Sequence, residues 1–295
     1  MKQKQKIIAI ILLCCTSIWL STKALQKLGT AKLNKSYQLS KKVSKIIITQ
    51  NKESFTLIKN KNNNWLIEGI TANNEKIKTV LKAIETLGNK KLISKNKNKH
   101  AIYHVTTANK TITLKQQNKR LLSLVIGKQG PTWNSTYIRF RSKNNVYLIN
   151  QPLANIITNE KNTWQELKIN PFLTQDIKTI SITINNQITS FELINNNWIN
   201  KKENSLISMS SINKLLTALT TLTASEVTLK SEKNIPIFFN INLKNHTNKS
   251  IDYSFFPISN EKTGVITSQK PNQIFSINTN ITIELMQKIN SISPL

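Results

Sequence analysis

Cysteine and aspartate are nearly absent from this chain of 295 residues. Its two cysteines, Cys14 and Cys15, both lie in one apolar run, so no disulfide framework can hold the rest of the chain. Asp176 and Asp252 are the only aspartates, and the glutamates are scattered. A pair of carboxylates for acid and base catalysis therefore cannot be located.

Other catalytic and metal-binding patterns are missing as well. His100 and His104 lie four residues apart, but no Asp, Glu or Cys stands near them and no HExxH glutamate is present. The stretch IGKQG at 126–130 lacks the spacing of a phosphate-binding loop and is interpreted as a hairpin turn. We expect no enzyme activity, no catalytic residue, no metal and no cofactor.

Arginine is scarce although the chain is strongly basic. Arg120, Arg139 and Arg141 are the only arginines among 42 basic residues, and the formal net charge is +28. Such charge attracts nucleic acid and anionic membranes. Lysine, asparagine and isoleucine, however, recur from end to end, which is typical of a compositional drift, as from an A/T-rich genome. We therefore expect no nucleic-acid partner.

The N-terminus carries the clearest targeting signal. Lys2, Lys4 and Lys6 precede the apolar run IIAIILLCCTSIWLS at 7–21, and Lys23 could extend it by snorkelling. This pattern predicts an uncleaved signal-anchor helix over 1–25, which crosses the membrane through residues 7–25. No second apolar run approaches this length. We expect a single-pass protein of the bacterial inner membrane, with its bulk facing the periplasm or exterior.

A repeat organises the remainder. The letters NNNW occur at 62–65 and at 195–198, each time after a run of residues that favour strands. Alternating isoleucines at 44–49 and 177–183 predict the strand before each hairpin. Five apolar positions at helical spacing follow each Trp, and the offset between the copies is 135 at all five. They are Ile77, Val80, Leu81, Ile84 and Leu87 in the first copy and Ile212, Leu215, Leu216, Leu219 and Leu222 in the second.

The fold class that follows is α+β, a tandem duplication of an antiparallel-sheet-plus-helix module after an N-terminal membrane-anchor helix. Four further strands and a closing helix, which begins near Pro152 in the first copy, complete each module. The expected boundaries are an anchor at 1–25, a juxtamembrane linker at 26–43, repeat 1 at 44–160, a linker at 161–176 and repeat 2 at 177–295.

This order of elements resembles a known bacterial family. The stretches VIGKQGPTWNSTYIRF at 125–140, VYLI at 146–149 and TWQELKI at 163–169, with the second ISIT, FEL and NNW series, are similar to the domain of unknown function 4340 family. The chain departs from it around 100–110, where HAIYHV replaces a Gly-Leu-Asp-like turn. The resemblance implies a membrane-anchored protein with repeated α+β modules outside, beside ABC-type export components of the gliding-motility kind. It implies no reaction.

Two surfaces are candidates for binding. Trp133 follows Gly130 and Pro131 in a loop without a counterpart in the second copy, and Tyr137 and Arg139 would share a strand face beside it. Trp, Tyr and Arg dominate protein interfaces, which favours a partner-binding role. Trp133 folded back over the sheet edge is the other interpretation.

The second surface is the stretch NKKLISKNKNKH at 89–100, which is either a solvated loop or a polyanion-binding module. Its lysines are Lys90, Lys91, Lys95, Lys97 and Lys99.

Overall fold

The computed structural model describes residues 39–230 and 236–292. In this part of the chain no helix is long and apolar enough to cross a membrane. The expected anchor at 1–25 lies outside the described residues, as does the expected linker before Leu39. The short helix α2, Leu39–Lys42, is the first described element.

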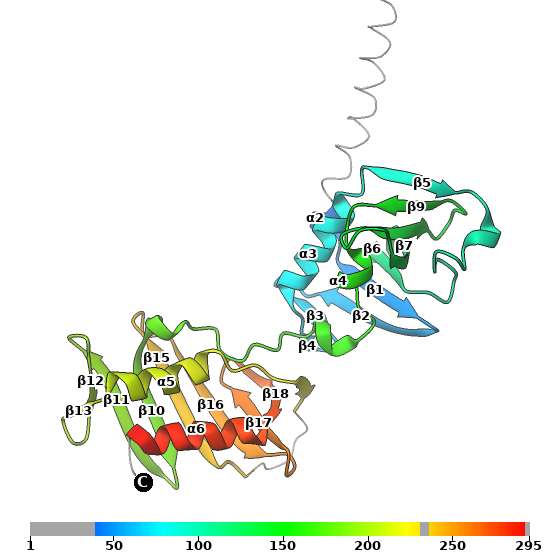
Figure 1. Cartoon of the computed structure of the whole chain (residues 1–295). Helices are drawn as coiled ribbons and strands as arrows, with labels where there is room; N and C mark the ends of the chain where they lie inside the picture. Colours follow the sequence, from blue (N-terminus) through cyan, green and yellow to red (C-terminus); the bar gives the residue numbers. More distant parts are fainter. Residues whose placement is uncertain (1–38, 231–235, 293–295) are drawn as a thin grey trace, which may run out of the picture. The chain divides into compact units, whose positions relative to one another are not determined.

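Two nine-stranded sheets dominate the fold, and their strands are antiparallel (Figure 1). The first has the order β4-β3-β2-β1-β6-β7-β8-β9-β5, and the second has the order β13-β12-β11-β10-β15-β16-β17-β18-β14. Adding nine to each number of the first order gives the second. The two sheets therefore repeat one topology.

The first copy contains the strands β1 to β9. Its strands are β1 Lys45–Gln50, β2 Glu53–Lys59, β3 Trp65–Ile67, β4 Ile70–Thr71, β5 Lys90–Ser94, β6 Thr111–Gln116, β7 Lys119–Gln129, β8 Thr136–Phe140 and β9 Val146–Ile149. Its helices are α3 Asn74–Glu85 and α4 Leu153–Ile156, with a 3-10 turn, η1, at Lys97–Lys99.

The second copy uses the same order of elements. Its strands are β10 Ile177–Ile184, β11 Gln187–Ile194, β12 Asn197–Asn200, β13 Ser205–Ile207, β14 Glu226–Leu229, β15 Phe239–Asn245, β16 Ser250–Pro257, β17 Lys262–Thr267 and β18 Lys270–Asn278. Its helices are α5 Met209–Thr220 and α6 Thr279–Ile292, and the 3-10 turns η2 Lys161–Trp164 and η3 Thr174–Asp176 precede β10.

The NNNW stretches form the tight turns predicted from the sequence. They join β2 to β3 and β11 to β12, and Asn63, Asn195 and Asn196 adopt positive φ, which Asn tolerates better than most residues. Trp65 and Trp198 are 5% and 3% exposed. Both tryptophans are therefore core residues of the strand that returns from the turn.

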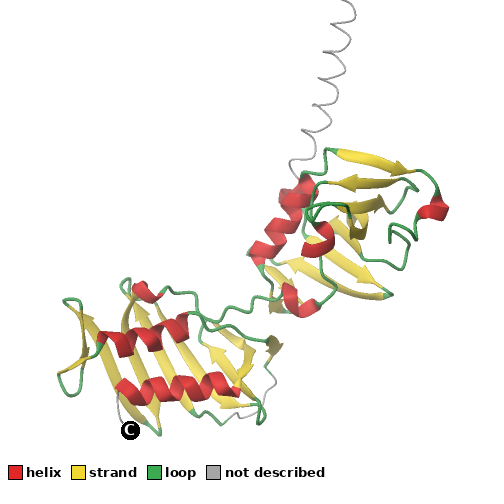
Figure 2. Cartoon of the chain, viewed as in Figure 1, coloured by secondary structure: helices red, strands yellow, loops and turns green. Residues whose placement is uncertain are grey.

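One apolar helix face packs on each sheet, as the spacing predicted. Four of the five predicted positions are buried within α3 and four within α5, while Leu87 and Leu222 follow the ends of these helices. In the second copy α6 lies beside α5 across the same face of the sheet (Figure 2). The closing helix of the first copy, α4, is only four residues long, where α6 has fourteen.

Two outer strands depart from the sequence prediction. The stretch 89–100 was predicted to be a loop, but Lys90–Ser94 forms β5 and pairs with β9. Strand β14 pairs in the same way with β18. Edge strands are short, carry charge and bury few side chains, so they lack the alternation by which strands are predicted.

The stretch expected to be a linker at 161–176 is packed against the second copy. The side chain of Gln165, 4% exposed, donates to the carbonyl of Val227 at 3.2 Å and accepts its amide hydrogen at 3.2 Å. Asn170, 1% exposed, donates to the carbonyl of Leu219. The chain from Glu160 onward, together with Asn60–Asn74, accordingly belongs to one compact unit.

Gly264 provides a test of core packing in the second sheet. It lies opposite Phe256, and a Cβ at Gly264 would approach the ring of Phe256 to 2.3 Å. We expect Gly264→Ala to destabilise the protein by about 1–3 kcal/mol, the usual cost of overpacking. Urea unfolding measures this loss. Adding Phe256→Leu should recover part of it, and a Gly264→Ala variant as stable as the wild type would contradict the packing.

Candidate functional site

The loop between β7 and β8 presents Trp133 to solvent. Its side chain is 74% exposed, so it is not folded back over the sheet edge. Within this loop the Gly130 amide donates to the carbonyl of Ser135 at 2.9 Å. The Ser135 hydroxyl, in turn, donates to the carbonyl of Thr132 at 2.9 Å and accepts from the Thr132 amide. These bonds within the loop fix the backbone on both sides of Trp133.

A small second core lies behind the sheet, on the face opposite α3. Val105, from the loop between η1 and β6, packs there with Val125 and Val146, and Tyr103 and Tyr137 pack beside them. The two tyrosine rings have centroids 4.8 Å apart. This loop, which contains the HAIYHV stretch, therefore covers part of the sheet's back face.

Gly127 permits this close approach. Its missing side chain leaves room for the Tyr103 carbonyl, which would be 2.3 Å from a Cβ, and the neighbouring Lys128 amide donates to the same carbonyl at 3.2 Å. The IGKQG stretch was interpreted as a hairpin turn, but Gly127 and Lys128 lie inside β7, and the turn begins only at Gly130. Gly127 is therefore required for the close approach of the loop between η1 and β6, here called the covering loop. It is not required for a reversal of the chain.

Arg139 fastens the same loop from within the protein. It is 5% exposed, and its guanidinium donates to the carbonyls of Val105 at 2.8 Å, Arg141 at 3.2 Å and Lys143 at 3.1 Å. Burial, and secondarily the charge of Arg141, lowers the pKa of Arg139. The sequence hypothesis put Arg139 on an open face beside Trp133. That placement is wrong, because a packed loop covers this face.

Tyr137 is half-buried against Tyr103, so of the three residues proposed for partner contact only Trp133 is widely exposed. His100 is buried, and its Nε2 lies 2.7 Å from the carbonyl oxygen of Asn144. In the described ranges no group of three or more His, Cys, Asp or Glu residues is placed to hold a metal ion.

The five lysines of the 89–100 stretch are all exposed. They do not form one loop: Lys90 and Lys91 lie on the edge strand β5, whereas Lys97 and Lys99 lie on η1. Lys90 Nζ lies 6.0 Å from the centroid of the Tyr147 ring. Lysines on an edge strand hinder pairing with another chain. This role explains Lys90 and Lys91 without assuming that they bind a ligand.

Comparison with known families gives one match. The family model described as domain of unknown function (DUF4340) matches residues 65–236. The chain belongs to this family. The match includes the β7–β8 hairpin with Trp133, the covering loop and Arg139, and it confirms the resemblance seen in the sequence. None of the curated proteins compared with the chain matches it.

Arg139 yields a prediction about the covering loop of this DUF4340 protein. Arg139→Met removes three hydrogen bonds to carbonyls, of which the one to Val105 is buried, and should cost about 2–4 kcal/mol, because hydrogen bonds to a charged group are strong and an orphaned buried acceptor is costly. We expect faster hydrogen exchange at the Lys128 amide, which is bonded to the loop. Arg139→Lys should be intermediate, and exposed Arg120→Met serves as the control. Unchanged hydrogen exchange at the Lys128 amide in Arg139→Met would show that Arg139 does not hold the covering loop in place.

Proposed function

We propose that this protein is a non-catalytic, membrane-anchored envelope protein that uses its duplicated α+β module for contact with another protein. The observation that carries the proposal is Trp133, exposed on a loop that is fixed by its own hydrogen bonds. A large aromatic side chain in solvent contributes little to folding. It contributes much to an interface, at little entropic cost when the loop is already ordered.

The lysine-rich N-terminal segment and the apolar run at 7–21 support the membrane anchor. We place the bulk of the protein on the periplasmic or outer side of a bacterial inner membrane. The partner class that we favour is a component of an ABC-type, gliding-motility-like transport system, and this rests on the family resemblance alone. The identical strand orders of the two sheets support an origin by tandem duplication.

A polyanion-binding module is the alternative function. Lys90, Lys91, Lys95, Lys97 and Lys99 are exposed, and none forms an ion pair among the described residues. Their division between a strand edge and a 3-10 turn favours protein contact over this alternative.

Trp133→Ala tests the contact surface. Because the side chain is already in solvent, we expect the free energy of unfolding to change by less than about 1 kcal/mol. Capture of ABC-type export components by the full chain in co-expressing cells should fall sharply, as should photo-crosslinking from position 133.

Leu206, which is 73% exposed on β13, provides the matched control Leu206→Ala. Equal capture by Trp133→Ala and the wild type would exclude Trp133 from the interface. Trp198→Ala, at a buried site, should lose about 3–5 kcal/mol and sets the scale of the stability assay.

A reporter fusion tests the topology. A reporter that is active only in the periplasm, fused after Leu295, should give activity if the single apolar run leaves the bulk outside. The same fusion with a reporter that works only in the cytoplasm is the control. Signal from the cytoplasmic reporter instead would reverse the proposed orientation.

A further inference from the structure

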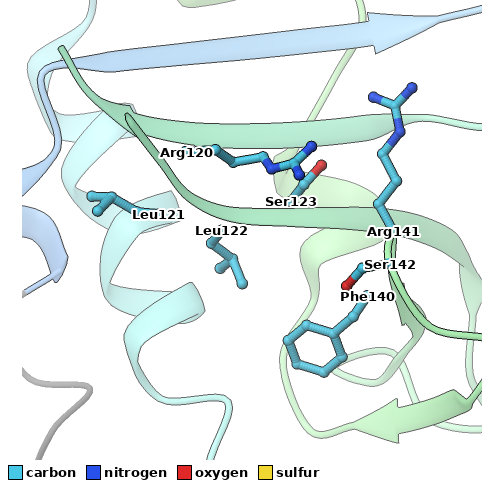
Figure 3. Close-up of a pocket in the computed structure, with 7 residues that line it drawn as sticks. All are labelled: Arg120, Leu121, Leu122, Ser123, Phe140, Arg141 and Ser142. Atoms are coloured by element: carbon cyan, nitrogen blue, oxygen red, sulfur yellow. The ribbon is translucent and has the colours of Figure 1, made fainter. Parts of the chain in front are cut away.

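Two of the three arginines line one surface hollow on the first copy. Arg120 on β7 and Arg141 just after β8 border a hollow of about 340 Å³, and the rest of its lining is three apolar residues and two serines: Leu121, Leu122, Phe140, Ser123 and Ser142. Figure 3 shows Arg120, Ser123 and Arg141 on one side of the strand pair and Phe140 on the other. Both arginines are exposed. Among the described residues neither forms an ion pair with an acidic side chain.

The turn that carries Arg141 is fixed by hydrogen bonds to its backbone. Arg139 donates to the carbonyl of Arg141 and to that of Lys143, and the Arg141 amide donates to the carbonyl of Ser123 at 3.0 Å. The Ser123 hydroxyl lies 2.8 Å from the Thr113 hydroxyl on β6. Arg141 therefore projects from an ordered backbone beside a hydroxyl group that is itself held in place.

Further cations share this end of the sheet. Lys45 on β1 lies opposite Lys115 on β6, and Lys115 lies opposite Arg120. Side chains directly opposite each other in antiparallel strands lie on one face, and like charges so placed destabilise a sheet. Three successive cations are thus an unfavourable arrangement, which an anion would relieve.

The second copy shows that the fold does not require these charges. The register pairs Thr179 with Lys244 and Lys244 with Ser250, so Thr179 stands where the first copy has Lys45, and Ser250 where it has Arg120. The Ser268 amide donates to the carbonyl of Asp252, as that of Arg141 does to Ser123. Serine therefore replaces both arginines, and an aspartate replaces Ser123.

We propose that this hollow, the arginine hollow, binds a phosphate-bearing group, and that the group is the headgroup of an anionic phospholipid. Arginine presents a planar fork of donors that matches phosphate oxygens, which lysine does not. The lipid source rests on the membrane anchor proposed above. Lys41 and Lys42 of α2 directly precede this end of β1, and the expected anchor ends at residue 25.

The test measures binding to the full chain in an uncharged detergent by calorimetry. The probes are dihexanoyl phosphatidylglycerol, dihexanoyl phosphatidylcholine and inorganic phosphate. Wild type should bind phosphatidylglycerol saturably and more tightly than phosphatidylcholine. Arg120→Ser combined with Arg141→Ser, which copies the second module, should weaken that binding about tenfold or more.

The matched control is Lys82→Gln with Lys214→Gln, which removes two exposed charges from α3 and α5. This control should change the affinity less than about twofold if the binding is local. Equal losses in both double variants, or no saturable binding to any probe by the wild type, would overturn the site. Circular dichroism should show that both variants remain folded.

The arms also separate the two sources of phosphate. If inorganic phosphate binds as tightly as phosphatidylglycerol, and the arginine variant loses both, the hollow is a phosphate site and the lipid source is wrong. A cytoplasmic result from the reporter at Leu295 or unchanged capture by Trp133→Ala would refute the proposed function, while the calorimetric loss in the arginine variant would still establish the phosphate site.

Discussion

A sheet of nine strands has two faces, and in the described part of the chain the α-helices cover only one face of each sheet. The second face must either be covered by another segment or be polar enough for water. The two copies meet this requirement differently. In the first, the loop with Val105 lies on the back face and Arg139 holds it there. In the second, hydroxyl, amide and carboxylate side chains pair across the strands, as Ser181 does with Ser190 and Asn242 with Asp252.

This difference decides where the copies could diverge in function. The sheet face under α3 and α5 packs against helices with the same spacing of apolar residues in both modules. A substitution on this face therefore costs packing energy. The back face differs between the copies, since a packed loop covers it in the first and polar side chains pair across it in the second. The register position of Arg139 in β8 is that of Ile266 in β17, and fewer residues separate β14 from β15 than separate β5 from β6. The exposed tryptophan, the clamped loop and the arginine hollow all belong to the back side and hairpin of the first copy.

The sequence predicted the elements that local pattern determines. Period-two isoleucines, the Asn turns and the helical stripes are local, and they were located to within a few residues. The face on which Arg139 lies was not predictable in this way. Alternation shows that Tyr137 and Arg139 share a face, but it does not show that a loop more than thirty residues earlier in the chain covers it. The same reason hides the role of Gly127, whose neighbour in space is Tyr103. The edge strand β5 was not predicted because its lysines are exposed, as is usual for the edge of a sheet. They do not show the alternation of apolar and polar residues that marks a half-buried strand.

The net charge of +28 is a weaker guide to binding than the geometry of a few side chains. Exposed lysines on flexible stems are screened by salt and lose entropy when they hold one ligand. Arg141 differs because its backbone is fixed by Arg139, and its partner across the strand carries a hydroxyl in place of the acid found in the second copy. A buried arginine thus positions an exposed one. Neither Arg120 nor Arg141 has an acidic partner among the described residues, and the second module has serine at both of these positions on the same strand pairing.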